Sequence, residues 1–332
     1  MRYLVTGGLG VIGSCIARRL LAAGHEVMII DACEAPRNLW IQRQLEKLGG
    51  DALSIMFARI ERYESNIHEK LAICDAVIHC AASTGIPHSV LHPDDDWASN
   101  VDATRVLLEA LRIHRQPTVV LSSVKPYFVP IGMNEGRGLN EQNVLEPDEP
   151  YAASKAAQSM LCMAYARSYD LPIVTFRCSN LYGPAPCHGP RHGWLTWFCI
   201  SAAIGRPIEI QGTGEQTRDM LHADDVYSAC VKALGALNSS VKMAGEVFNL
   251  GGGRLNRISI CQAARALHEI TGVEVHNAPA RAMDDDHVYV DHWYFTDKTG
   301  WRPDVPVGAG MLQILAWAQE HKDELSKLYE GV

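Results

Sequence analysis

The sequence predicts an α/β protein built on a Rossmann-type, doubly wound parallel sheet, with a smaller discontinuous C-terminal substrate lobe. Three observations lead to this fold class. Short apolar runs alternate with segments of helical periodicity through the first half of the chain, closely spaced glycines follow the first run, and an aspartate ends the second. Strands that alternate with helices form right-handed βαβ units and therefore a parallel sheet.

The expected elements of this first half follow one another in order. The strands are expected at 2–6, 26–30, 53–57, 76–80, 117–121 and 172–176, and the helices at 11–23, 94–114 and 150–169. In the first helix, Ile12, Ile16 and Leu20 recur at helical spacing, and Gly24 ends the helix because it tolerates left-handed dihedrals.

From residue 177 the alternation breaks. The stretch 180–221 is rich in Gly, Pro and aromatic residues, and the remaining elements are expected to be helices at 222–237, 259–271 and 308–327 and a strand at 246–250. We therefore expect two parts of the chain with different tasks. These are a dinucleotide-binding domain over 1–178, to which about 222–250 returns, and a substrate lobe from about 179–221 and 251–330.

Composition excludes several classes of protein. The 332 residues are 47% hydrophobic and 20% charged, which is too apolar for a disordered chain. No stretch approaches the ~20 apolar residues that a membrane span needs. The net charge of −8 leaves no broad basic surface for nucleic acid. An anionic ligand would have to be bound by a few arginines or by backbone N–H groups.

The ten cysteines are scattered and form no CxxC pair, which is typical of reduced thiols in a cytosolic protein. We expect a cytoplasmic protein whose N-terminus is retained, since the glycines after the first strand make a poor signal helix. Cys187, His188 and His192 could suggest a metal, but their Gly/Pro-rich loop offers no ligand scaffold, and no metal is expected.

After the first expected strand the chain reads TGGLGVIG, which places Gly7, Gly10 and Gly13 at GxxGxxG spacing. A tight turn needs a residue free in φ, close approach of a pyrophosphate needs the absence of Cβ, and helix–strand packing needs a small residue. The pyrophosphate would lie at the helix N-terminus, at Val11 and Ile12, where N–H groups and the helix dipole favour negative charge.

Asp31 ends the second expected strand, 18 residues after Gly13. A carboxylate at this place can accept hydrogen bonds from both hydroxyls of the adenosine ribose. No arginine follows as far as Glu34, and two carboxylates would repel a 2′-phosphate, so NAD is favoured over NADP. The alternative is that Asp31 is only a polar strand end.

Tyr151 and Lys155 lie four residues apart on an expected helix, so their side chains share one face. A free phenol, with a pKa near ~10, is a poor base at neutral pH. We expect the Lys155 ammonium to stabilise the phenolate and lower the pKa of Tyr151. The phenol could then take a proton from a substrate hydroxyl as hydride leaves the same carbon. A chance surface pair is the alternative.

Small and hydroxylated residues follow two other expected strands. Ser122 and Ser123 end the fifth strand, which puts the Ser123 hydroxyl at the carboxyl end of the sheet, where open α/β folds bind ligands. It could hydrogen-bond the reacting oxygen beside Tyr151, although such a serine is also often a cap or turn residue. Ala81 and Ala82 follow the fourth strand and would let a dinucleotide lie close to the backbone.

Together these motifs resemble the extended short-chain dehydrogenase/reductases that act on nucleotide sugars. The matching segments cover nearly the whole chain: TGGLGVIG (6–13), HCAA (79–82), NVDAT (100–104), Ser122-Ser123, Tyr151-xxx-Lys155, RCSNLYGP (177–184) and RDMLHADD (218–225). Within the family, HGWLTWFC (192–199) and QGTGEQTRD (211–219) look most like CDP-tyvelose (CDP-paratose) 2-epimerases.

The resemblance implies a role for the matching residues around the cofactor. Tyr151 would be the catalytic acid/base, and Ser123 would orient the substrate hydroxyl. Lys155 would hold the nicotinamide ribose and bias the tyrosine. Asn100 would belong to the cofactor site.

On the substrate side, the resemblance places Asn180 and Arg218 in a nucleotide-sugar pocket, with Arg218 on a phosphate and Arg281 as a second phosphate ligand. A charge-assisted Arg–phosphate bond suits an otherwise acidic protein. An ion pair of Arg218 with Asp219 or Asp224 is the structural alternative.

The residues after Ser123 discriminate between branches of the family. Dehydratases of this family carry an acidic residue directly after the strand-end hydroxyl, whereas this chain has Val124 and Lys125. We therefore expect an NAD-dependent epimerase that oxidises one carbinol transiently and returns the hydride to the opposite face. A dehydratase or 4-keto reductase of the same family stays an alternative, as does a non-catalytic dinucleotide-sensing regulator.

The resemblance also implies a homodimer. In the family's usual dimer, the helices expected near 95–114 and 150–168 pair with those of a second copy to form a four-helix bundle.

Overall fold

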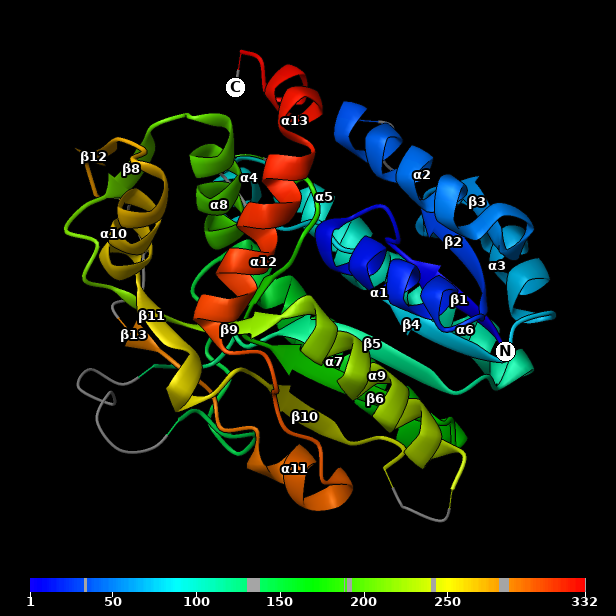
Figure 1. Cartoon of the computed structure of the whole chain (residues 1–332). Helices are drawn as coiled ribbons and strands as arrows, with labels where there is room; N and C mark the ends of the chain where they lie inside the picture. The colour runs from blue at the N-terminus through cyan, green and yellow to red at the C-terminus, as the bar shows by residue number, and fades with distance from the viewer. Residues whose placement is uncertain are drawn as a thin grey trace.

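The computed structural model describes residues 1–32, 35–129, 138–187, 189, 193–239, 243–280 and 287–331 (Figure 1). A seven-stranded sheet with strand order β10-β6-β5-β4-β1-β2-β3 forms its centre, and every pair in it is parallel. Its strands are β1 (Arg2–Thr6), β2 (Glu26–Asp31), β3 (Leu53–Phe57), β4 (Ala76–His79), β5 (Thr118–Ser123), β6 (Ile173–Cys178) and β10 (Val247–Leu250). The strand order reverses at β1 and β4, as in a doubly wound fold, so the predicted fold class is confirmed.

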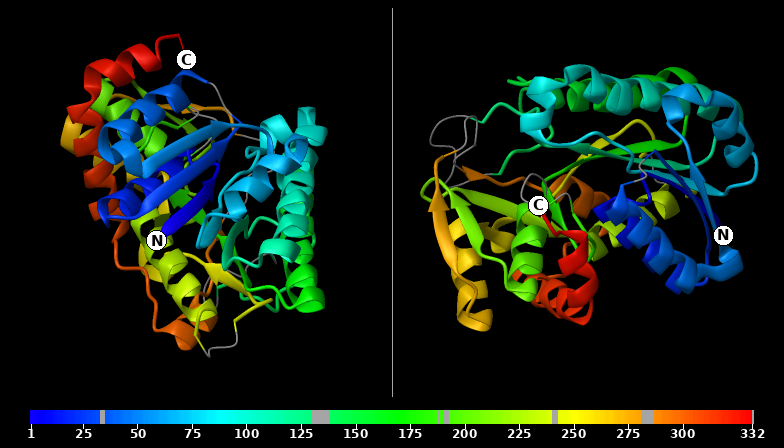
Figure 2. Two further views of the ribbon diagram at one scale, coloured as in Figure 1. Left: turned by 90° about the vertical axis from the view of Figure 1, so that its right-hand side faces the viewer. Right: turned by 90° about the horizontal axis from the view of Figure 1, so that it is seen from above.

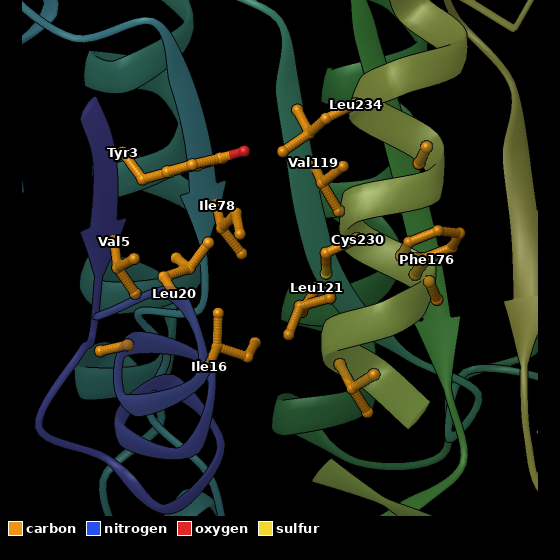
Figure 3. Close-up of a cluster of buried hydrophobic side chains, with 14 of the residues drawn as sticks. Tyr3, Val5, Ile16, Leu20, Ile78, Val119, Leu121, Phe176, Cys230 and Leu234 are labelled. Atoms are coloured by element: carbon orange, nitrogen blue, oxygen red, sulfur yellow. The ribbon is translucent and has the colours of Figure 1, made fainter. Parts of the chain in front are cut away.

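Helices cover both faces of this sheet, as the view from above shows (Figure 2). One face carries α1 (Val11–Ala22), α2 (Pro36–Gly49) and α9 (Ala223–Leu237), and the other carries α3 (Glu64–Leu71), α6 (Ala103–His114) and α7 (Pro150–Tyr169). Successive residues of a strand point to opposite faces. Tyr3 and Val5 therefore pack with Ile16 and Leu20 of α1 (Figure 3), while Leu4 packs in the core on the other side.

The long helix expected at 94–114 is interrupted. It consists of α5 (Pro93–Asp96), a π-helical segment over Trp97–Asp102 and then α6. π-Helical turns are rare and are found often at functional sites. Similarly, the last expected helix is two helices, α12 (Val307–Glu320) and α13 (Lys322–Leu328).

The second half of the chain adds two small sheets and a second core. In the larger sheet, β9 (Thr217–His222) pairs with β7 (Asn180–Tyr182), β11 (Arg257–Ser259) and β13 (His287–Val288), and in the smaller one β8 (Ile208–Gln211) pairs with β12 (Val275–Ala278). Helices α8 (Trp194–Ile204), α10 (Ile260–Thr271), α12 and α13 enclose the second core. The remaining helices are α4 (Ile86–Leu91) and α11 (Trp293–Thr299).

None of the helices that the structure describes combines the length and apolar character needed to cross a membrane.

Candidate active site

Gly7 and Gly13 form the tightest part of the turn after β1. Gly7 has a φ of +65°, and a Cβ on this residue would lie 2.6 Å from the backbone nitrogen of Ala81. A Cβ on Gly13 would lie 2.2 Å from the carbonyl oxygen of Gly7. Because backbone atoms block both positions, the turn packs as it does only with glycine.

The N-terminus of α1 opens directly from this turn. Gly10, which has no side chain, is the N-cap in an extended conformation, and its N–H donates to the carbonyl of Gly7 at 3.1 Å. Val11 and Ile12 form the first turn of the helix. N–H groups of a first helical turn have no partner within the helix and attract anions together with the helix dipole.

Asp31 is a buried carboxylate that faces the glycine turn, rather than an exposed strand end. Its Oδ2 accepts a hydrogen bond from the N–H of Leu9 at 2.9 Å. Asn38 of α2, which was not predicted as a site residue, donates from Nδ2 to the Leu9 carbonyl at 2.9 Å. The two side chains thus hold both backbone groups of one residue in the turn. Glu34 lies outside the described residues.

Ala81 and Ala82 follow Cys80 after the end of β4, and the N–H of Ala81 donates to Thr6 Oγ1 at 3.4 Å. Asn100 is fully buried in the π-helical segment. Its Nδ2 donates to Ser154 Oγ at 2.8 Å and to the Ser83 carbonyl at 3.1 Å, and its Oδ1 accepts from the Ser83 N–H at 3.0 Å. Asn100 therefore ties the loop after β4 to α7, and its direct contact with a cofactor stays a prediction.

Ser123, Tyr151 and Lys155 come together where β5 ends and α7 begins. The side chains of Ser123 and Tyr151 are hydrogen-bonded to each other. Lys155 is 2% exposed, and its Nζ donates to the Leu121 carbonyl at 3.1 Å and to Gln158 Oε1 at 2.6 Å. Ser123 and Tyr151 thus meet at the carboxyl end of β5, and Lys155 contacts the backbone of the same strand; their joint catalytic role stays a prediction.

The predicted direction of the Tyr151 pKa is wrong for this structure. Burial raises the pKa of Tyr151 to about 12, against the opposing effect of the Ser123 hydrogen bond, and the carboxylates of Glu149 and Asp96 raise it further. Burial also lowers the pKa of Lys155 to about 8. Sequence spacing puts the two side chains on one helix face but contains no information on how deeply the protein buries them.

A second set of hydrogen bonds extends from the lysine into the protein. Gln158 Nε2 donates to Thr104 Oγ1 at 3.0 Å, so the amide that accepts from Lys155 also binds α6. Glu149, the N-cap of α7, accepts from the N–H groups of Tyr151 and Ala152, each at 2.8 Å. Neither residue was predicted. Pro150 at the first helical position is a helix-start signal that could have drawn attention to Glu149 before it.

His79 connects this set to β1. Its Nε2 lies 3.1 Å from Thr104 Oγ1, and its Nδ1 lies 2.7 Å from Thr6 Oγ1. The Thr104 hydroxyl donates its one proton to the Asn100 carbonyl at 2.7 Å, so it accepts from the His79 Nε2–H, and Nδ1 accepts from Thr6. Burial lowers the pKa of His79 to about 3, which keeps the ring neutral. A continuous path of hydrogen bonds therefore joins the lysine to the strand before the glycine turn.

Asn180 and Arg218 lie on neighbouring strands. Asn180 of β7 pairs with Met220 of β9, and Arg218 is two residues earlier on β9, so both side chains belong to the same face. Arg218 is largely buried, and its Nη1 donates to the Thr217 carbonyl at 2.9 Å. Arg281 lies outside the described residues.

The carboxylates considered as partners of Arg218 have partners elsewhere. Asp219 Oδ2 accepts from the Val290 N–H at 3.0 Å, and Asp224 Oδ1 lies 3.5 Å from Arg19 Nε. His188 and His192 lie outside the described residues. Within the part of the chain that the structure describes, no three His, Cys, Asp or Glu side chains are grouped as metal ligands.

The glycine turn, the helix N-terminus and Asp31 fit a dinucleotide. The turn is so close to the backbone after β4 that side chains are excluded, which is the environment a pyrophosphate needs. Asp31 would hold the adenosine ribose, and Lys155 would hold the nicotinamide ribose.

The model of the family described as "NAD dependent epimerase/dehydratase family" matches residues 3–251. The chain is 28% identical to the CDP-paratose 2-epimerase of Salmonella typhi, over 96% of this chain and 99% of that one. The structure is similar to the UDP-glucose 4-epimerase of Thermotoga maritima with UDP-glucose, with a TM-score of 0.81 and 28% identity over 98% of this chain and 100% of the other.

A third relative is a dTDP-glucose 4,6-dehydratase. The double mutant of this enzyme from Streptomyces venezuelae, solved with NAD bound, has a TM-score of 0.84 and 26% identity over 99% of this chain and 100% of that one. Epimerases and dehydratases are thus similar to the chain to nearly the same degree. The match of the family model and the geometry of the dinucleotide site lead to the same family. The chain belongs to the NAD-dependent epimerase/dehydratase family of extended short-chain dehydrogenase/reductases, with NAD as its cofactor.

Proposed function

We propose that the chain is an NAD-dependent nucleotide-sugar epimerase. The observation that carries the proposal is the pair of residues after Ser123. A dehydratase needs a further acid and base to eliminate water, but Val124 is buried in an apolar cluster with Tyr127, and Lys125 carries a positive charge.

Carboxylates elsewhere in the site do not replace the missing acid. Glu149 uses both oxygens as the cap of α7, and the exposed Asp148 has its Oδ1 3.6 Å from Lys125 Nζ. Asp96 is buried. These placements favour chemistry that needs one proton acceptor only.

Epimerisation by transient oxidation needs only one such acceptor. Tyr151 would take the proton of the carbinol hydroxyl, Ser123 would hold the same oxygen by a hydrogen bond, and Tyr151 would return the proton after the sugar has presented its other face. When bound, NAD supplies the hydride acceptor, the hydride donor for the return, and a positive charge that favours the phenolate of Tyr151. Lys155 would keep the ribose and the local positive charge in place.

The substrate would be held by the second half of the chain. We place the diphosphate on Arg218 and Arg281 and the sugar near Asn180, with the cofactor on residues 1–178 and 222–250. The pairing of β10 with β6 in the main sheet supports this division.

A homodimer is part of the proposal. Helices α6 and α7 pack side by side on one face of the sheet (Figure 2). Large apolar side chains on them are exposed: Ile113 of α6 and Met160 and Tyr169 of α7. Covering these residues by the same helices of a second copy would form a four-helix bundle.

The function is tested by incubating the NAD-loaded protein with UDP-, GDP- and CDP-sugars and following the sugar signals by NMR. We expect an epimer to form without net NADH, and the Tyr151→Phe variant to lose turnover by roughly 100-fold or more while it still binds NAD. A 4-keto-6-deoxy product would identify a dehydratase, and net oxidation of NADH a reductase. A Tyr151→Phe variant with full biological output would favour a regulator.

A further inference from the structure

Asp96 is a buried carboxylate that none of the predicted functions uses. It is the last residue of α5, directly before the π-helical segment, and it is 1% exposed. Neither of its carboxylate oxygens has a hydrogen-bond partner among the residues that the structure describes. Asp94, on the same short helix, is exposed.

The surroundings of Asp96 include the catalytic helix. Helix α5 packs against α7, and the Asp96 carboxylate acts electrostatically on both Tyr151 and Lys155. Ionisable groups of other elements interact electrostatically with Tyr151 or Lys155 as well: Glu149 at the start of α7, Cys162 on α7, His79 on β4, Cys80 after β4, and Cys178 on β6.

The thiols of Cys178, Cys162 and Cys80 raise the pKa of Lys155 only in their ionised form, and the Glu149 carboxylate acts on Tyr151. Burial raises the pKa of Cys80, Cys162 and Cys178, so the thiols are neutral at physiological pH. His79 is neutral as well. The acceptors of the Lys155 ammonium, the Leu121 carbonyl and the Gln158 amide, carry no net charge.

A buried carboxylate without hydrogen bonds is highly unfavourable unless another charge compensates it, and the same holds for a buried ammonium. Asp96 and Lys155 are two such groups on packed helices. We propose that Asp96 is a positioning residue of the catalytic site, whose carboxylate is the counter-charge that keeps Lys155 in the ammonium form and holds the proton of Tyr151. The inference rests on the proposed function only where it concerns turnover.

Loss of this charge should act on both catalytic groups in the same direction. Without the Asp96 carboxylate, the ammonium form of Lys155 and the neutral form of Tyr151 are both less favoured. Both limbs of a pH–rate profile should therefore move to lower pH. A role in packing alone would lower the rate at every pH and leave the limbs where they are.

The test is the titration of Lys155, which needs no substrate. In protein labelled with ¹³C at lysine Cε, the Lys155 signal is assigned by its loss in Lys155→Met, and its midpoint is followed by NMR in wild type, Asp96→Asn, Asp96→Leu and Asp94→Asn. We expect a wild-type midpoint near pH 8. Both Asp96 variants should lower it by about one pH unit, and Asp94→Asn should leave it unchanged.

The second test is the pH dependence of turnover. With any nucleotide sugar that is turned over, the basic limb of kcat should move by the same amount in Asp96→Asn. An unchanged Lys155 midpoint in both Asp96 variants, or an equal shift in Asp94→Asn, would overturn the inference. If no nucleotide sugar reacts, the proposed function fails, and the NMR midpoint still decides the role of Asp96.

Discussion

Gln158 Oε1 accepts a hydrogen bond of 2.6 Å from the Lys155 ammonium, three residues earlier on the same helix. The other end of the Gln158 amide donates to Thr104 on α6. Lys155, the predicted catalytic lysine, is thus fixed by a neutral side chain that is itself hydrogen-bonded to a second helix. This arrangement restrains the ammonium without neutralising it, which a carboxylate in the place of Gln158 would do.

Replacement of Gln158 by leucine should therefore impair catalysis. A hydrogen bond to a charged group contributes about 1.5–3 kcal/mol, so we expect Gln158→Leu to lower kcat by roughly tenfold or more. The basic limb of the kcat pH profile should move to lower pH, because loss of the hydrogen bond destabilises the ammonium form of Lys155 and lowers its pKa. Measured pH–rate profiles check this. Gln313→Leu, on the exposed side of α12, is the control, and equal profiles for the two variants would contradict the expectation.

A single methyl group in the glycine turn should abolish cofactor binding. In Gly13→Ala, the new Cβ would meet the Gly7 carbonyl oxygen at 2.2 Å, and backbone cannot move away easily. We expect the Kd for NAD to rise by roughly 100-fold or more, about 2.7 kcal/mol, by calorimetric titration.

Gly235→Ala is the matched control for this change. Gly235 lies within α9, and a Cβ there meets nothing within 4 Å. This variant should bind NAD normally and unfold with a free energy about 0.5–1 kcal/mol higher, because alanine favours the helix. Normal NAD binding by Gly13→Ala would refute the assignment of the turn.

The main sheet was predictable because each parallel strand is buried on both faces and is visible as a short apolar run. The strands β1 to β6 lie within two residues of their expected bounds. Helices α2 and α3 were not predicted. Helix α3 has only eight residues, and both helices are mostly polar. Helix α2 buries only Asn38, Trp40, Ile41 and Leu45, too few apolar residues for a clear helical period.

In the site, sequence spacing was enough to predict that two residues of one helix lie side by side. It was not enough to predict contacts between different helices and strands. Tyr151 and Lys155 are related by helix geometry alone. The direction of the Tyr151 pKa shift is set by burial, and the carboxylates of Glu149 and Asp96 add to it; α5 brings Asp96 in from 55 residues earlier in the chain. Asn100 belongs to a recognisable motif, but only the fold reveals that its amide binds Ser83 and Ser154.

Removal of the Arg218 charge should weaken substrate binding selectively. Charge-assisted hydrogen bonds contribute about 1.5–3 kcal/mol, so Arg218→Met should raise KM for the nucleotide sugar by roughly tenfold or more and leave the Kd of NAD unchanged. Arg254→Met, an exposed arginine after β10, is the control. If Arg218→Met had a normal KM and impaired NAD binding, Arg218 would bind the cofactor and not the substrate.

Charges on the exposed face of α6 and α7 should dissociate the proposed dimer. Light scattering at micromolar concentration should give twice the mass of the chain for the wild type and the mass of one chain for the double variant Ile113→Glu/Met160→Glu. Leu312→Glu, on an equally exposed apolar residue of α12, should remain dimeric. A monomeric wild type would exclude the four-helix bundle.

Asp219 should make the stability of the protein fall as the pH rises from about 4 to 7. Its carboxyl is fully buried, accepts from the Val290 N–H, and has its pKa raised by burial from 3.8 to about 7. Between these values the folded protein keeps a proton that the unfolded chain releases, so the free energy of unfolding decreases by about 1.4 kcal/mol per pH unit from this group. Asp219→Asn has no such proton, and urea unfolding at pH 5, 6 and 7 should show a smaller decrease for this variant than for the wild type. The exposed Asp51→Asn should keep the wild-type slope, and equal slopes in all three proteins would show that Asp219 is ionised in the fold.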